Sequence, residues 1–351
     1  ALVFSVSTAS ADLNSVIQAG ADRVDGLQHT DGKWGWPLNA PPTYNNITGP
    51  IGLGQINAYT ATGDPNHLTS ATDAGNALDG LTADWVGSYN PMFLLALYDA
   101  TGTASYLTQA QSFYTDLNAG TYTRSAVNYD TAGFISLVQT NRAGVWMNLL
   151  PWEFAPLTYA ASQAGNATQE AAFMQAMKDA IDTLDNSDPN TVYSDIIGLA
   201  GGVMGLSLMG EDFDPTAGAY SAASSTADLA DTLANLQNPN GSWYWHSNLS
   251  SPTAGDEDLQ TTAYAVLALL AANDSAQFDD EIYAARGYLM AAQLGNGGWN
   301  SYPGGSENAE VDGEIVWALA ASAAVVPEPG SITLVGIGLI SLIASRRQQV
   351  R

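Results

Sequence analysis

Cysteine is absent from this 351-residue chain. The sequence therefore excludes disulfide bonds, thiolate zinc sites and cysteine nucleophiles together. The three histidines, His29, His67 and His246, show no ligand spacing, and neither a glycine-rich phosphate loop nor a Gly-x-Ser-x-Gly elbow appears. We therefore expect no metal site and no cofactor.

Basic residues are nearly as scarce. Nine Lys and Arg stand against 35 Asp and Glu, which gives a formal net charge of −26 at pH 7. A groove that follows a phosphate backbone needs clustered cations, so nucleic acid is excluded as a partner. Any chemistry has to come from acidic and aromatic side chains.

A repeated motif, Gln-x3-Gly-x-Trp, is present three times. The copies run from Gln28 to Trp34, from Gln237 to Trp243 and from Gln293 to Trp299. The first copy follows apolar residues at helical spacing, and a Gly at such a position can end a helix with a positive φ angle. We predict that the glutamines end outer helices on one side of the molecule, and that each Trp covers its helix end as a structural residue.

The motif resembles the QW repeat of squalene and oxidosqualene cyclases, which protein prenyltransferases share in a looser form. The third copy also has the basic residue, glycine, aromatic residue and leucine of that family, at 286–289. The resemblance covers about 222–325 and 12–60. It implies an all-α fold in which residues 12–325 form one (α/α)6 toroid.

The same resemblance argues against two activities of that group. Prenyltransferases hold zinc through a cysteine, which this chain lacks. Squalene-hopene-type cyclases donate a proton from the middle Asp of Asp-x-Asp-Asp-Thr-Ala, and here Gln260 occupies that place. Because a neutral amide cannot protonate an alkene, a terpenoid cyclase is the third-ranked hypothesis.

Asp258 and Glu314 are the candidate catalytic pair. Each stands 15 residues beyond a repeat Trp, so the repeat predicts equivalent places at the N-terminal ends of neighbouring inner helices. Paired carboxylates 5 to 10 Å apart, one with a raised pKa, would suit general acid–base catalysis on glycosides. The alternative is that both simply cap helices.

Four further residues beside the repeats are predicted to contact a substrate at the mouth of the barrel: Trp36, Trp245, Tyr302 and Asp256. Aromatic faces suit sugar rings or apolar chains, and core packing is the alternative. Residues 119–148 are the least regular part of the chain. There, the stretch from Gln139 to Trp146 is either a degenerate copy of the motif or an ordinary connector.

Both ends of the sequence carry targeting features. Residues 1–11 end in Ala-x-Ala, as in the remnant of a signal peptide cut before Asp12. At the other end, Pro327-Glu328-Pro329 precedes an apolar stretch and Arg346-Arg347. Residues 326–351 thus resemble the PEP-CTERM sorting signal.

The PEP-CTERM resemblance implies that an exosortase recognises the tail and removes it. It also implies a transient anchor helix in the inner membrane and a final place at the cell surface or outer envelope of a Gram-negative bacterium. We therefore expect an exported toroid that binds or processes envelope polysaccharide. The alternative is a non-catalytic matrix or interaction module.

Overall fold

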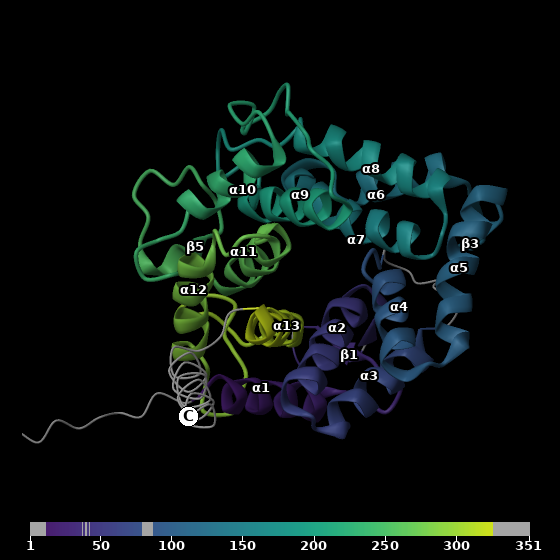
Figure 1. Ribbon diagram of the computed structural model, residues 1–351, viewed down its shortest axis with the longest axis horizontal. Helices are drawn as coiled ribbons and strands as arrows, with labels where there is room; N and C mark the ends of the chain where they lie inside the picture. The colour runs from purple at the N-terminus through teal and green to yellow at the C-terminus, as the bar shows by residue number, and fades with distance from the viewer. Residues whose placement is uncertain (1–11, 37, 39–40, 42, 79–86, 326–351) are drawn as a thin grey trace, which may run out of the picture.

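The computed structural model describes residues 12–36, 38, 41, 43–78 and 87–325. Within them, six helices form an inner ring: α2 (Asn45–Thr62), α4 (Asn90–Thr101), α7 (Leu150–Gln163), α9 (Asp195–Met209), α11 (Leu259–Ala272) and α13 (Ala309–Val325). Each packs on the next, and α13 packs on α2, so the ring closes (Figure 1). The chain is an all-α toroid, as the resemblance implied.

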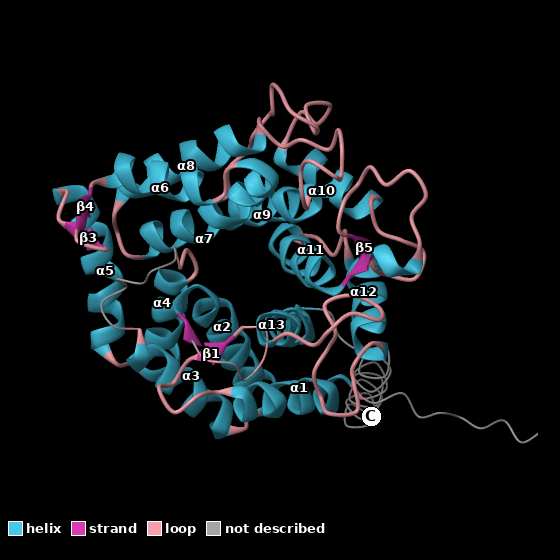
Figure 2. Cartoon of the chain, turned by 180° about the vertical axis from the view of Figure 1, so that it is seen from behind, coloured by secondary structure: helices cyan, strands magenta, loops and turns pink. Residues whose placement is uncertain are grey.

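Seven further helices lie outside this ring (Figure 2). They are α1 (Leu13–Leu27), α3 (Pro65–Ala77), α5 (Ala104–Ala119), α6 (Thr131–Asn141), α8 (Ala167–Ile181), α10 (Thr226–Asn235) and α12 (Asp279–Ala291). Outer and inner helices alternate, with α6 as an addition beside α8. The architecture is an (α/α)6 toroid with one extra outer helix.

Sequence pattern explains which helices lie inside. The outer helix α1 buries a single stripe that includes Val16, Ile17 and Val24, as an amphipathic helix does. The inner helix α9 is buried from Asp195 to Leu206 and has almost no polar face. Its Gly201 lies so close to the backbone of Trp152 that a β-carbon would not fit. Inner helices can therefore approach closely.

Most inner helices lead to the next outer helix through short turns on one side of the ring, whereas α9 reaches α10 through the longer stretch 210–225. Gly63 and Gly102 end α2 and α4 in the left-handed conformation, with φ angles of 75° and 70°. The connections into the inner helices are much longer: 28–44, 120–149, 182–194, 236–258 and 292–308. Loops that carry function are commonly the long ones on a rigid scaffold.

Neighbouring long loops are bonded to one another. The Tyr193 amide donates to the Val145 carbonyl at 2.7 Å, and the Leu259 amide donates to the Ser301 carbonyl at 3.0 Å. The Ser247 amide donates to the Asp195 carboxylate oxygen Oδ1 at 3.0 Å. The N-terminal ends of the inner helices and the loops leading into them therefore share one end of the ring, which we call the mouth.

Three short antiparallel ribbons lie in these loops. They are β1 (Trp34–Gly35) with β2 (Thr43–Tyr44), β3 (Tyr122–Arg124) with β4 (Val127–Tyr129), and β5 (Trp243–Tyr244) with β6 (Glu257–Asp258). Two 3₁₀ turns, η1 (Gly144–Leu149) and η2 (Ala254–Asp256), precede α7 and β6. These short ribbons shape loops and do not form a β-domain.

The three Gln-x3-Gly-x-Trp loops have the same geometry. Each Trp is fully buried, and its indole N–H donates to the outer helix that it follows, as Trp299 does to the Leu289 carbonyl at 2.8 Å. Each Gln amide donates to the carbonyl of its own loop glycine and to a carbonyl of the next outer helix. We call each such loop a staple.

The staples join one outer helix to the next. Gln28 reaches Ser70 in α3 and Gln237 reaches Glu281 in α12, both at 2.8 Å. Gln293 reaches Val16 in α1 at 2.9 Å, which connects the last outer helix to the first. All three staples thus hold neighbouring outer helices together in the same way.

The stretch from Gln139 to Trp146, for which a degenerate copy and an ordinary connector were both open, forms no staple: Trp146 is 44% exposed, whereas the three staple tryptophans are fully buried. The predicted signal-peptide remnant and sorting tail lie outside the described residues. None of the described helices is long and apolar enough to cross a membrane.

Candidate functional site

The predicted pair Asp258 and Glu314 lies on adjacent inner helices at the mouth, but not at equivalent places. The Trp243 amide donates to Thr262, and the Trp299 amide donates to Asp312. Asp258, four residues before Thr262, therefore corresponds to Asn308. The predicted equivalence is wrong, because the loop after Trp299 reaches its helix in fewer residues.

Asp258 is the N-cap of α11. Its Oδ1 accepts hydrogen bonds from the Thr261 amide and hydroxyl, both at 2.6 Å. The side chain is half-buried, and burial raises its pKa. Asp258 therefore caps a helix, as the alternative held, and also presents a carboxyl group with a second oxygen at the mouth.

Glu314 lies in the second turn of α13 and is fully buried. Gln260 donates to its Oε2 at 2.8 Å, and the Tyr264 hydroxyl donates to its Oε1. Burial raises the pKa of Glu314 well above its ordinary value, and the charge of Glu310 adds to the effect. Gln260, which occupies the place of the cyclase proton donor, is thus a partner of this acid.

Two acids that sequence reasoning missed surround Glu314. Glu310 stands one turn earlier on α13 and is half-buried, and burial raises its pKa to about 7. Glu153, in the first turn of α7, is buried and accepts bonds from Ser88 and from Arg142. We call Glu153, Asp258, Glu310 and Glu314 the acid cluster.

Arg142 is the cation that faces this cluster within the described residues. It follows α6 and its Nε donates to Glu153 at 2.7 Å. The charge of Glu153 raises the pKa of the guanidinium, and Glu310 contributes to the same effect. The positive charge of Arg142 therefore interacts with both Glu153 and Glu310.

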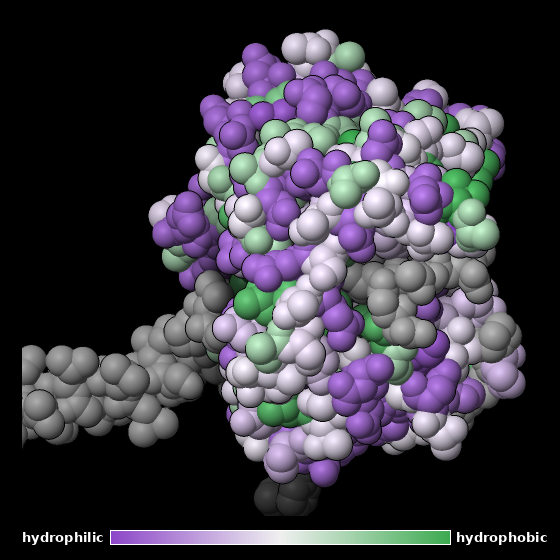
Figure 3. Space-filling model, turned by 90° about the vertical axis from the view of Figure 1, so that its right-hand side faces the viewer, coloured by the Kyte–Doolittle hydropathy of each residue, from purple (hydrophilic) through white to green (hydrophobic). Residues whose placement is uncertain are grey.

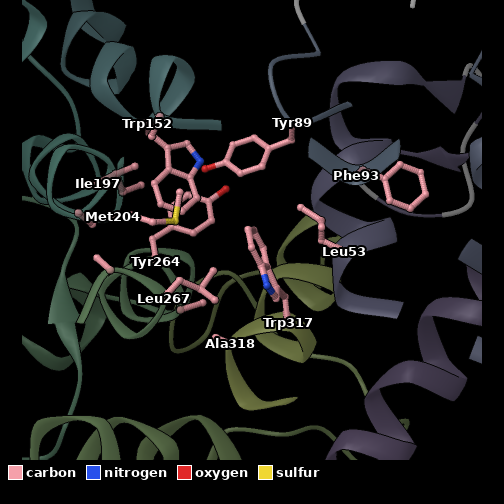
Figure 4. Close-up of a cluster of buried hydrophobic side chains, with 14 of the residues drawn as sticks. Leu53, Tyr89, Phe93, Trp152, Ile197, Met204, Tyr264, Leu267, Trp317 and Ala318 are labelled. Carbon is pink, nitrogen blue, oxygen red and sulfur yellow. The ribbon is translucent and has the colours of Figure 1, made fainter. Parts of the chain in front are cut away.

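Next to the acid cluster, aromatic side chains from α7, α11, α13 and the N-cap position of α4 meet (Figure 4). Trp152 stacks on Tyr264 with ring centroids 3.7 Å apart, and Tyr89 lies against both Trp152 and Trp317. All four are at most 6% exposed. Trp152 and Tyr264 touch directly, so no substrate chain passes between them.

Exposed aromatic side chains gather at the mouth. Among the described residues, those above a third exposed are Trp36, Trp146, Tyr193 and Tyr302, at 51%, 44%, 41% and 49%. Each stands in a loop that leads into an inner helix. The exposed aromatic side chains therefore stand at the same end of the ring.

Three of the mouth loops are joined by ring contacts. Tyr193 stacks on Trp245 with centroids 4.6 Å apart, and Trp146 leans on Tyr193 at 5.1 Å. The charges of Asp258 and Tyr302 affect the pKa of Tyr193, which burial raises. We call Trp146, Tyr193, Trp245 and Tyr302 the aromatic rim. Trp36 is also at the mouth, in the loop that leads into α2, and the contact between α13 and α2 separates it from the aromatic rim.

Asp256 has a local structural role. Its carboxylate accepts from the Thr253 amide and hydroxyl at 2.8 and 2.9 Å and completes the capping box of η2. These bonds lower its pKa. Asp256, which the sequence predicted to contact a substrate, thus holds the turn that begins at Thr253.

One group of described side chains has metal-ligand spacing: Asp22, Asp25 and His67. It lies between the outer helices α1 and α3, away from the mouth. His67 Nδ1 is 3.1 Å from Asp25 Oδ2, and the ring is fully buried. His67 occupies the connector position that Tyr106 occupies in the next hairpin, which is a packing position.

Comparison with known proteins supports the fold and the tail. Residues 325–348 match the PEP-CTERM protein-sorting motif. No curated protein is similar enough in sequence to count as a relative of the chain.

Solved structures of similar shape include two kinds of toroid enzyme. An unsaturated glucuronyl hydrolase specific for heparin is 14% identical with a TM-score of 0.56, over 89% of this chain and 97% of the other. A possible member of the GH105 family from Salmonella enterica is 13% identical with a TM-score of 0.59, over 91% and 96%.

The type II terpene cyclase MstE from Scytonema is 15% identical with a TM-score of 0.54, over 90% of this chain and 99% of the other. At these identities the likeness shows the fold alone. The sorting motif indicates export to the cell envelope. The chain is therefore similar to α/α-toroid enzymes and carries a PEP-CTERM motif.

Proposed function

We propose that the mouth binds an envelope polysaccharide. The observation that carries the proposal is the gathering of the exposed aromatic side chains at the mouth, beside partly exposed acids. Sugar rings stack on aromatic faces through their C–H groups, and the carboxyl groups can accept hydrogen bonds from hydroxyls. Export to the envelope would bring the chain to such a polymer.

We further propose that acids of the mouth process the bound glycan, with Asp258 and Glu310 as the reacting pair. Glu314, predicted for this task, is fully buried and held by Gln260 and Tyr264. It cannot touch a substrate in this arrangement. Glu310 lies one turn nearer the mouth on the same face of α13, and its pKa of about 7 keeps part of it protonated at neutral pH.

In this proposal the protonated Glu310 gives its proton to the glycosidic oxygen as the bond to the anomeric carbon breaks. The ionised Asp258 takes a proton from the water whose oxygen forms the new bond. The products are two shorter glycans, and no oxidant or metal is consumed. Glu314 is not a reacting group: burial and the charge of Glu310 raise its pKa well above the ordinary value, so it stays protonated.

The test measures chain length of extracted envelope polysaccharide with the purified chain and its amide variants. Glu310→Gln and Asp258→Asn should each abolish shortening, while an amide at 258 can still cap α11 and keep the fold. Asp280→Asn on α12, an exposed position, is the matched control. Full activity in both amide variants would remove the catalytic proposal.

A non-catalytic interaction module is the second candidate. The observation that favours it is the complete burial of Glu314 with both carboxylate oxygens engaged. In that case the wild-type chain binds the polysaccharide without shortening it. Loss of binding in Trp146→Ala, with no turnover by any variant, would decide for the module.

For the chain as a whole we propose three parts: a signal-peptide remnant at 1–11, the toroid at 12–325 and a removable sorting tail at 326–351. The motif match at 325–348 supports an exosortase as the processing partner. Mass spectrometry of the mature protein should find a C-terminus near 328–330. Intact Arg351 on mature surface protein would contradict removal of the tail.

A further inference from the structure

Three rings of the aromatic rim stand in loops that are bonded to one another. The Tyr193 amide donates at 2.7 Å to the carbonyl of Val145, the residue before Trp146. On its other side, the Tyr193 ring stacks on Trp245 with centroids 4.6 Å apart. The rings therefore keep their arrangement only while the three loops that carry them keep theirs.

A buried carboxyl group lies where two of these loops meet. Asp195, the first residue of α9, is fully buried and follows Tyr193 by two positions. Its Oδ1 accepts the Ser247 amide at 3.0 Å, and its Oδ2 accepts the Ser247 hydroxyl. Ser247 in turn stands two positions after Trp245. The two partners of this contact are thus close in sequence to the two rings of the stack.

Several donors hold the Asp195 carboxylate. The Tyr220 hydroxyl donates to Oδ2, the same oxygen that accepts the Ser247 hydroxyl. His246 Nδ1 lies 3.6 Å from Oδ1, but it accepts the Asn248 amide and so does not donate to the carboxylate. An acidic side chain in the first turn of a helix is also favoured by the helix dipole. Hydrogen bonds to a carboxylate are the strong ones, so this contact holds the two loops firmly.

The backbone between Tyr193 and Asp195 is strained. Ser194 has φ and ψ angles of 52° and 50°, the left-handed conformation that costs a residue with a side chain free energy. Such a conformation persists only where the surrounding contacts impose it. The backbone bond of Tyr193 before it and the bonds of Asp195 after it fix both ends of this residue.

We propose that Asp195 is a positioning residue that, through Ser247, holds the stacked rings of the aromatic rim in a preformed face for a sugar. This inference rests on the proposed function, because it concerns glycan binding at the same mouth. Asp195 is fully buried and does not reach the glycan itself. A face that is already ordered avoids the entropy cost of ordering its side chains on binding, so the affinity depends on the contact behind it.

Calorimetric titration of the purified chain with extracted envelope polysaccharide tests the inference. Ser247→Ala removes the hydroxyl bond to Asp195 and should weaken binding about tenfold. Ser247→Thr keeps a hydroxyl and should restore the wild-type affinity. Tyr220→Phe is the matched control: it removes a hydroxyl bond to the same carboxylate oxygen from the stretch 210–225, which carries no ring of the rim, and should bind like the wild type.

Two further measurements separate positioning from a general loss of structure. Denaturation midpoints of Ser247→Ala and Tyr220→Phe should be similar, because each variant loses one hydroxyl bond to Asp195. In a Trp245→Ala background the stack is already absent, so adding Ser247→Ala should have no further effect on the affinity. A merely structural serine would weaken binding in both backgrounds.

The outcomes distinguish this inference from the proposed function. Wild-type affinity in Ser247→Ala, an equal loss of affinity in Tyr220→Phe, or a full loss on adding Ser247→Ala to Trp245→Ala would each overturn the positioning role. In all three cases the wild-type chain still binds, so the proposed function stands. If the wild-type chain does not bind the extracted polysaccharide, the proposed function fails and the positioning role fails with it.

Discussion

Two arcs of the ring are held together in different ways. In the stapled arc, 226–325 continued by 13–77, a glutamine at the end of an outer helix bonds the next outer helix. In the unstapled arc, 90–209, the outer helices α5, α6 and α8 meet through an aromatic cluster that includes Phe113, Phe134 and Phe173. The outer wall around α5 is largely polar to neutral in hydropathy, with scattered apolar patches (Figure 3).

The difference shows what a repeat constrains. A staple needs a glycine, because a β-carbon at Gly297 would run into the Ala19 carbonyl oxygen of the next helix. It also needs a fixed spacing to bring the Trp and the Gln to their carbonyls. An aromatic cluster tolerates many arrangements of similar volume. Arg142, Trp146 and Glu153 stand in the unstapled arc, outside any repeated spacing.

The largest expected difference between the arcs concerns glycine. Gly297→Ala places a side chain at a φ angle of +93° against a backbone carbonyl and should cost about 3 kcal/mol or more of unfolding free energy. Gly144 in the unstapled arc has a φ angle of +74° but nothing near it, so Gly144→Ala should cost only about 1–2 kcal/mol. Chemical denaturation measures both, and equal losses would contradict the staple.

The glutamine bonds should come next in size. Gln293→Ala removes two hydrogen bonds, including the one to Val16 that closes the outer ring, and should cost about 1–3 kcal/mol. Gln111→Ala on the exposed side of α5 should change the stability by less than about 0.5 kcal/mol. If the two variants unfold at the same denaturant concentration, the amide bonds contribute nothing.

A smaller effect distinguishes two staples from each other. Thr262 receives the Trp243 amide, whereas Asp312 receives the Trp299 amide, and burial raises the pKa of Asp312 to about 8. Because the folded pKa exceeds the ordinary value, the stability that Asp312 contributes is present below about pH 4 and is lost as the pH rises to about 8.

Asp312→Asn should therefore be more stable than the wild type at pH 9, by on the order of 1–3 kcal/mol, and the gain should disappear near pH 4. Thermal unfolding between these pH values checks it, with Asp280→Asn as the exposed control. Parallel stability curves for the wild type and Asp312→Asn would show that this acid does not titrate with folding.

The smallest effect on stability is expected at the aromatic rim. Trp146 is 44% exposed, so Trp146→Ala should cost less than about 1 kcal/mol, although it should weaken glycan binding. Trp299→Ala in the stapled arc should cost about 3–5 kcal/mol. A severe loss of stability in Trp146→Ala would mean that the rim serves packing in place of binding.

The sequence predicted the stapled arc well because its contacts are local and repeated. Gln237, Gly241 and Trp243 bond groups near their own helix end, so their spacing carries the geometry. The error at Glu314 has a physical cause as well. The loop after Trp299 is shorter than the loop after Trp243. Counting 15 residues from each tryptophan assumed loops of equal length and therefore did not reach equivalent helix positions.

The rest of the site depends on contacts that no repeated motif encodes. Arg142 meets Glu153 only because α6 ends beside the start of α7, and nothing in the irregular stretch from 119 to 148 indicated that pairing. Glu310 could have been found, because it stands four residues before Glu314 on the same helix face. Trp146 and Tyr193 stand in loops without any repeat.

The bond from Gln293 to Val16 also sets the order in which the molecule can be completed. Two residues 277 positions apart must meet before the outer ring is closed, and contacts of such separation form late and slowly. An exported chain that leaves its N-terminus first would hold α1 without its α12 neighbour until the last hairpin has crossed. The hairpin that contains α12 emerges late, and its docking then covers the side of α1 that was exposed to solvent until that point.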